Sequence, residues 1–216
     1  MSECLRGVGG ADMGISMEFS GYRKITAGHL AVVPWKNGGG VTTEIAVGPA
    51  RAGDQEWSWR ISVAEVGVTG AFSVFPGIDR TIAVVHGNGM ILEFEGGRMI
   101  PLELNRPVDF DGGAVVTGIL RNEAIRDFNV MVDRRYYSAT LSIVEGSDEL
   151  SLKSSAGSVV VIHVLDGVCT AHVAAGAQET LSVQETAIYE GETDVSIAVP
   201  PGARAAVVVI EDVSIP

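Results

Sequence analysis

Short apolar runs separated by turn-forming residues cover most of the chain. The runs are rich in Val, Ile, Thr and Phe, and Gly, Asp and Asn stand between them, which is typical of short β-strands. Asn88-Gly89 and Asp166-Gly167 are dipeptides that hairpin turns prefer. Strands are predicted at Trp57–Val63, Thr81–Val85, Met90–Glu95, Ala114–Leu120, Phe128–Val132, Ser138–Val144, Ser158–Leu165, Val168–Val173, Thr186–Tyr189 and Ala205–Ile210. The pattern predicts an all-β fold, with one short helical turn at most in Leu120–Asp127.

The strand pattern contains an internal repeat. His86-Gly87 overlays Asp166-Gly167 at an offset of 80 residues, and Val108–Gly112 overlays Ala187–Gly191 at an offset of 79. Two anchors at nearly the same offset predict a duplicated unit of about 80 residues, built as a small β-barrel or jelly roll. The alternative is that any two β-hairpins resemble each other. With duplication, we expect a flexible tail at 1–20, a first half at 21–135 and a second half at 136–216.

Composition and charge limit the classes of function. The chain has 216 residues, of which 46% are hydrophobic and 19% charged, so it is not an intrinsically disordered protein. Its formal net charge of −12 argues against non-specific nucleic-acid binding. No apolar run reaches the roughly 20 residues of a membrane span. Two distant cysteines and the absence of a signal-peptide pattern at the start predict a cytoplasmic protein without membrane partners.

Common catalytic and metal-binding patterns are missing from the sequence. A cupin-type metal site needs two His at positions i and i+2 of one strand, where alternation places both on one face. The four His of this chain, His29, His86, His163 and His172, include no such pair. Neither a Gly-x-Ser-x-Gly elbow nor a phosphate-binding loop is present. We therefore expect no metal and no cofactor.

Candidate binding residues gather in a glycine-rich segment and inside apolar strands. Glycines let the backbone turn sharply and bring its N–H groups close to a ligand. In Trp57–Val63, alternation places Arg60 on one face with Ser62. The plain alternatives are a glycine-rich turn and Arg–carboxylate pairs that organise loops, such as Arg126 with Asp127 or Arg80 with Glu65. The candidates are Trp35, Lys36, Asn37, Gly38, Gly39 and Gly40, then Arg60, Glu65, Asp79, Arg80 and Asn129.

Several motifs occur in an order that resembles the HutD/Ves family of small bacterial proteins. They are Pro34–Gly40, Glu44–Ala46, Trp59–Ser62, Phe75–Thr81 and Arg126–Met131. The resemblance implies a bicupin fold with a metal-free pocket in the N-terminal half. It also implies a role in histidine utilisation, in which a small metabolite is bound and the flux of histidine degradation is tuned.

The family signature carries over to individual positions of this chain. This sequence departs from the family signature at Thr43, where the family commonly has a basic residue, and at His86, where an acidic residue is more frequent in the family. The N-terminal tail is extra. The signature positions are Trp35, Lys36, Asn37, Gly38, Gly39, Gly40, Glu44, Arg60, Glu65, Asp79, Arg80 and Asn129, and Phe75 belongs to the same motifs.

Three functional hypotheses follow. The first is a metal-free binding protein for a small carboxylate, such as formylglutamate or urocanate, with a regulatory role. Its ligand would contact basic Lys36 and Arg60, amides Asn37 and Asn129, and aromatic Trp35 and Phe75. The second is a small-acid isomerase or hydrolase with Glu44 or Glu65 as general base. The third is an interaction protein with a vestigial pocket, and a homodimer formed through strand edges is compatible with each.

Overall fold

The computed structural model describes residues 21–35, 38–51, 56–146, 148–173 and 178–214. The tail predicted for 1–20 and the candidates Lys36 and Asn37 lie outside the described residues. The described part of the chain forms strands β1–β19 and one 3-10 turn, η1 (Ala27–His29). The all-β prediction is confirmed, and no helix occurs within Leu120–Asp127, where bends at 121–123 join two strands.

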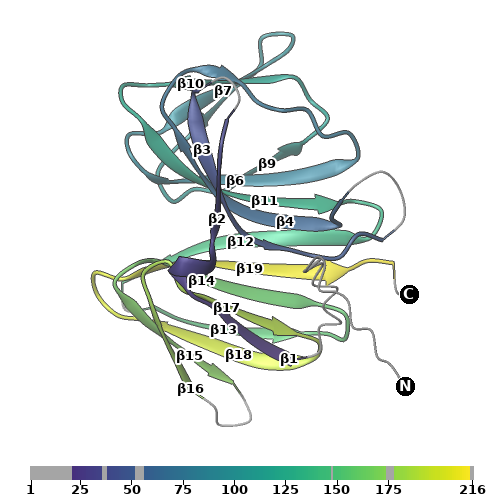
Figure 1. Cartoon of the computed structure of the whole chain (residues 1–216), viewed down its shortest axis with the longest axis vertical. Coiled ribbons are helices and arrows are strands. Elements are labelled where there is room, and N and C mark those ends of the chain that lie inside the picture. The colour runs from purple at the N-terminus through teal and green to yellow at the C-terminus, as the bar shows by residue number, and fades with distance from the viewer. Residues whose placement is uncertain (1–20, 36–37, 52–55, 147, 174–177, 215–216) are drawn as a thin grey trace, which may run out of the picture.

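Two antiparallel sheets form the first lobe, drawn in blue and teal in Figure 1. The larger sheet has the order β2 (Ala31–Pro34), β3 (Gly40–Val47), β4 (Trp59–Val66), β11 (Ile125–Asp133), β6 (Ile78–His86) and β9 (Val108–Asp111). The smaller sheet has the order β5 (Gly70–Ala71), β10 (Val116–Leu120), β7 (Met90–Phe94) and β8 (Met99–Leu102). Apolar side chains such as Ile82 and Leu92 fill the space inside this lobe.

The second lobe, drawn mostly in green and yellow, is built in the same way. Its larger sheet has the order β1 (Gly21–Ile25), β17 (Thr186–Glu190), β14 (Val159–Asp166), β19 (Arg204–Asp212) and β12 (Tyr137–Glu145). Its smaller sheet has the order β13 (Asp148–Ser154), β18 (Thr193–Val199), β15 (Val168–Val173) and β16 (Gln178–Ser182). Its interior is again apolar, with Ile162 and Leu181 fully buried.

The predicted duplication is visible in the strand order. The run β4-β11-β6-β9 corresponds to β12-β19-β14-β17, and β5-β10-β7-β8 corresponds to β13-β18-β15-β16. Each copy therefore has eight strands in two facing sheets, the arrangement of a jelly roll. Chance similarity of two hairpins does not account for a repeated order of eight strands.

The two lobes share a third apolar core. Trp59, Phe128 and Val130 of the first lobe pack with Val161 and Val208 of the second. Burying an apolar side chain of this size contributes roughly 1.5–3 kcal/mol, so this cluster holds the two large sheets face to face. Figure 1 shows β4 and β11 lying above β12 and β19.

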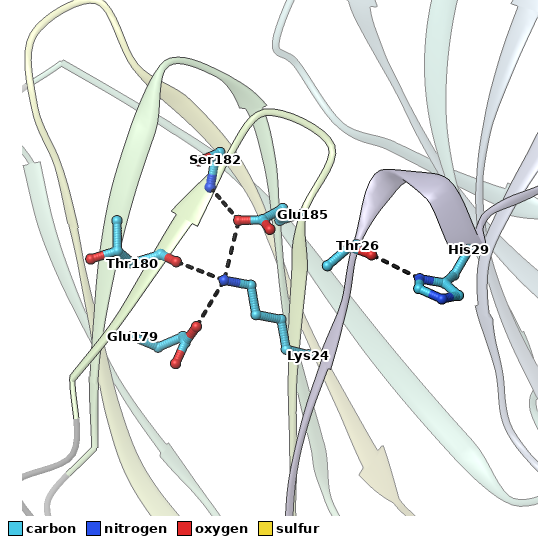
Figure 2. Close-up of polar contacts among 7 residues, drawn as sticks. All are labelled: Lys24, Thr26, His29, Glu179, Thr180, Ser182 and Glu185. Atoms are coloured by element: carbon cyan, nitrogen blue, oxygen red, sulfur yellow. Dashed lines mark hydrogen bonds and ion pairs between the residues drawn. The ribbon is translucent and has the colours of Figure 1, made fainter.

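The chain crosses between the lobes near its start. Strand β1 pairs with β17 in the second lobe, and after η1 strand β2 pairs with β3 in the first. Figure 2 shows how β1 is tied down: Lys24 Nζ lies 2.8 Å from Glu179 Oε1 and 3.2 Å from Glu185 Oε2. It also donates to the carbonyl of Thr180 at 2.9 Å. Thus β1 belongs to the sheet of the later strands, and the division of the chain at residue 135 stays a prediction.

Gly48 offers a test of how closely the shared core is packed. A Cβ atom at Gly48 would lie 2.1 Å from Nε1 of Trp59, whose side chain is 2% exposed. Because this ring is held by both lobes, Gly48→Ala should lower the free energy of unfolding by about 1–3 kcal/mol in urea denaturation. Gly70→Ala is the control, since a Cβ there meets nothing within 4 Å, and should change stability by less than about 0.5 kcal/mol. Equal unfolding midpoints for the two variants would contradict this packing.

Candidate functional site

A cavity of about 580 Å³ opens inside the first lobe. Alternation along two neighbouring strands supplies its polar wall: Arg60 and Ser62 come from β4, and Asp127 and Asn129 come from β11. Ser62 lies directly opposite Asn129 in the antiparallel register. The facing wall is aromatic, with Trp35 before β3 and Phe72 and Phe75 after β5. The site is therefore an apolar pocket with a few convergent polar groups, the usual composition of a small-molecule site.

A buried polar chain forms one wall of the cavity. Arg80 on β6 is 8% exposed, and its Nη2 donates to Oδ1 of Asn129 at 2.7 Å. Nδ2 of Asn129 in turn donates to Oδ1 of Asp127. The Arg80 guanidinium contacts two rings, 5.2 Å from the centroid of Phe72 and 5.0 Å from that of Phe110. Cation–π contact with both rings helps to hold this guanidinium in place.

Burial shifts the protonation of both ends of this chain. Desolvation lowers the pKa of Arg80 to about 10, partly opposed by the charge of Asp127. Desolvation also raises the pKa of Asp127 to about 7, while Arg80 and the Asn129 hydrogen bond act in the opposite direction. Near neutral pH, Arg80 therefore stays cationic, whereas Asp127 exchanges between a hydrogen-bond donor and an acceptor.

Arg60 provides a second guanidinium on the cavity wall. Its Nε donates to Oε2 of Glu44 at 2.9 Å, and its side chain is 21% exposed. Among the described residues, no hydrogen bond involves its two terminal nitrogens, so these can meet a ligand. Two guanidinium groups then face one pocket, and Asp127, the one carboxyl group among its described lining residues, is partly neutral. This arrangement favours a ligand with a negative charge.

The glycine-rich segment positions Trp35. Nε1 of Trp35 donates to Oγ1 of Thr42 at 2.8 Å, which holds the indole against β3. A Cβ atom at Gly40 would lie 2.2 Å from the carbonyl oxygen of Glu65 and 3.2 Å from the Trp35 ring. Gly38 has a φ of 69°, in the left-handed region. The glycines thus let the chain turn tightly behind an aromatic wall, which is the plain alternative considered from the sequence.

The structure brings together five of the predicted site residues and places two others elsewhere. Trp35, Arg60, Phe75, Arg80 and Asn129 line the cavity, and Glu44 contacts it through Arg60. Glu65 lies on the opposite face of β4, because it is an odd number of residues from Arg60. Asp79 precedes Arg80 and points away for the same reason, with Oδ1 2.9 Å from Nη2 of Arg134.

Sequence analysis missed several lining residues, of which Asp127 matters most. It was considered only as an ion-pair partner of its neighbour Arg126, although adjacent residues on a strand point to opposite faces. Asp127 and Asn129 are two residues apart on one strand, so their side chains point to the same face, and this spacing was the signal available in the sequence. The other lining residues that are absent from the predicted site are Val33, Pro34, Thr42, Ser62, Ala64, Ala71, Phe72, Ser73 and Met131.

The described residues hold no group of three or more His, Cys, Asp or Glu side chains placed to bind a metal ion. His163 is 4% exposed, bonds through Nδ1 to Oγ1 of Thr186 at 2.8 Å and packs against Phe128. Within the same residues, no helix has the length and apolar character needed to cross a bilayer.

Two jelly-roll halves with a ligand-sized cavity in the first give this protein a cupin-like all-β fold. Comparison with known proteins identifies its family. The model of the HutD family matches residues 27–207, and the chain therefore belongs to the HutD family.

Individual relatives agree with this assignment. An uncharacterized 21.2 kDa protein of the hutC 3' region of Pseudomonas putida is 38% identical over 129 residues, covering 60% of this chain and 66% of that protein. Protein Ves of Citrobacter koseri is 32% identical over 130 residues, covering 60% of this chain and 64% of that protein. The matches thus span just under two thirds of these curated relatives. HutD from Pseudomonas fluorescens SBW25, solved in a formate condition, is 30% identical with a TM-score of 0.73, and the alignment covers 88% of this chain and 98% of that one.

Proposed function

We propose that this protein is a metal-free bicupin that binds a small carboxylate in the cavity of its first lobe and thereby regulates histidine utilisation. The observation that carries the proposal is the pair of guanidinium groups, Arg60 and Arg80, on the wall of one aromatic-lined pocket. Membership of the HutD family and a relative from the hutC region support the link to histidine utilisation.

The geometry suggests how a carboxylate would be held. The terminal nitrogens of Arg60 offer a planar pair of donors that matches the two carboxylate oxygens. Arg80 is committed to Asn129 through Nη2 and adds positive potential from the wall. Asp127 in its protonated form can donate to an oxygen of the ligand, which a charged carboxylate at that position could not do.

The cavity suits the metabolites that the family context suggests. A volume of about 580 Å³ lies within the range of roughly 300–1,000 Å³ that is usual for small-molecule sites. Formylglutamate and urocanate both carry a carboxylate and an apolar or planar portion that could lie against Trp35 or Phe75. We propose a cytoplasmic protein with this ligand as its partner, without nucleic-acid or membrane partners, and with a homodimer as one compatible assembly.

A thermal-shift screen tests the proposed function. The purified protein would be heated with urocanate, formylglutamate, glutamate, histidine or formate, each with and without divalent metal ions. A ligand at about 100 times its Kd should add about 2.7 kcal/mol of stability. We expect a shift from urocanate or formylglutamate that does not require metal. A shift that appears only with metal, or none from either acid, would contradict the proposal.

Catalysis is a second candidate function, and the ionisation of Asp127 favours it. The sequence suggested Glu44 or Glu65 as general base, but Glu65 faces away from the cavity and Glu44 is paired with Arg60. A carboxyl group whose pKa is about 7 is better placed to exchange a proton with a bound acid at neutral pH. Turnover of urocanate or formylglutamate by the pure protein, lost in Asp127→Asn, would favour an isomerase or hydrolase over a binding protein.

A further inference from the structure

A second cavity, of about 170 Å³, lies where the two lobes meet. Glu65 on β4 and Arg126 on β11 contribute from the first lobe. His163 on β14 and Gln184, in the turn before β17, contribute from the second. Glu65 is a position of the family signature and Arg126 begins the motif Arg126–Met131, but neither of these two residues lines the first cavity. Their position suggests that this part of the motif serves a different site.

Glu65 and Arg126 bring opposite charges to the cavity without neutralising each other. They are directly opposite in the antiparallel register of β4 and β11. Side chains in such positions usually lie close enough to pair. Here neither side chain forms an ion pair or a hydrogen bond with another described residue. Both charges are therefore available to a ligand that carries a positive and a negative group close together.

His163 adds a directed polar group inside the same cavity. Thr186 is fully buried, and among the described residues its hydroxyl contacts only Nδ1 of His163, at 2.8 Å. The hydroxyl proton is satisfied only if Nδ1 accepts it, so the ring proton lies on Nε2. Burial lowers the pKa of His163 to about 4, which keeps the ring neutral. Nε2–H is thus a donor on the cavity wall, and no described residue accepts from it.

The remaining cation of this cavity is structural. Arg204 donates from Nε to Asp166 at 2.7 Å and from Nη1 to Asn105 at 2.8 Å. Its Nη2 donates to the carbonyl of Val85 at 2.9 Å. These bonds join the two lobes and occupy all three guanidinium nitrogens. A ligand would therefore depend on Arg126 for its negative group.

From this placement we infer that the cavity between the lobes binds a small α-amino acid, with the carboxylate on Arg126 and the ammonium group on Glu65. Nε2–H of His163 donates to a carboxylate oxygen or to a polar side chain of the ligand. A volume of about 170 Å³ is below the range of roughly 300–1,000 Å³ that is usual for ligand pockets, which suits a small molecule. The ligand contacts both lobes and so stabilises their present arrangement.

Calorimetric titration of the full chain with glycine, L-alanine, L-serine and L-histidine tests this inference. At least one of these amino acids should bind. The substitutions Arg126→Gln and Glu65→Gln should each lower the affinity for that amino acid at least tenfold. Arg106→Gln, which changes an exposed arginine, should stay within about twofold. For L-alanine, the analogues alaninamide and propionate each lack one of the two charges and should bind at least tenfold more weakly. Urea unfolding curves for the variants would verify that they are folded.

Three results would overturn the amino-acid site. The first is that none of the four amino acids releases or absorbs heat at roughly 10 mM. The second is that wild type, Arg126→Gln and Glu65→Gln bind the amino acid with equal affinity. The third is that Arg60→Ala loses amino-acid binding while Arg126→Gln retains it. The last result would place the ligand in the first cavity. Carboxylate binding there is expected to be unaffected by Arg126→Gln, so the two sites can fail or succeed separately.

Discussion

Arg60→Ala is expected to weaken carboxylate binding about 100-fold while leaving the free energy of unfolding close to that of the wild type. The binding loss follows because the two terminal nitrogens of Arg60 form no hydrogen bond with another described residue, and its side chain is 21% exposed on the cavity wall. The small effect on stability follows because its partner, Glu44, has a side chain that is 35% exposed and can be hydrated once Arg60 is gone.

Calorimetry with urocanate and formylglutamate, together with urea denaturation, measures both parts of this prediction. Arg106→Ala is the matched control, since it removes one positive charge from an exposed position outside the cavity. If both variants weaken binding equally, the effect is one of overall charge and not of contact. Unchanged affinity in Arg60→Ala would remove this residue from the proposed site.

Asp127→Asn is expected to change how stability depends on pH. The folded-state pKa of Asp127 is raised from 3.8 to about 7, so the folded protein favours its protonated form. The stabilising contribution is complete below the unfolded-state pKa and is lost as pH rises towards 7. Asparagine does not titrate and keeps the size and hydrogen-bonding oxygen of the acid. Between pH 4.5 and 7.5, the variant should therefore gain about 3 kcal/mol in free energy of unfolding relative to the wild type.

His163 makes the comparison with the wild type essential. Burial lowers its pKa from 6.5 to about 4, so its contribution is present above pH 6.5 and is lost as pH falls towards 4. In the wild type this opposes the contribution of Asp127 between these pH values. The His163 contribution is common to both proteins and cancels in their difference. Urea unfolding at the two pH values measures that difference, and parallel pH dependence of wild type and variant would show that Asp127 is ionised normally.

Much of the fold was predictable because its signals are local. Alternating residues such as those in β7 mark strands directly. Asn88-Gly89 and Asp166-Gly167 mark the ends of strands but not hairpins, because the strands on either side, β6 and β7 or β14 and β15, lie in different sheets. The repeat at an offset of about 80 residues then predicted two similar halves, and the strand order confirms them. By contrast, β1 lies in the sheet of the second lobe, and its pairing with β17 spans more than 150 residues. No local pattern carries that information.

The candidate site was predictable in part, for a related reason. Alternation correctly placed Arg60 with Ser62, but it could not say which face of β4 lines a cavity. Glu65 was therefore grouped with Arg60, although the strand points it towards the space between the lobes. Asp127 was considered only as an ion-pair partner of Arg126, because its burial arises from the packing of strands that are far apart in the sequence. Sites formed by packing of distant strands need the tertiary structure.

The most direct test of the central claim is a crystal structure of the protein grown with saturating urocanate or formylglutamate. The account predicts a ligand in the first cavity, with a carboxylate oxygen within about 3.2 Å of a terminal nitrogen of Arg60 and the remainder against Trp35 or Phe75. A ligand bound elsewhere, or an empty first cavity at a concentration well above the Kd measured by calorimetry, would contradict it.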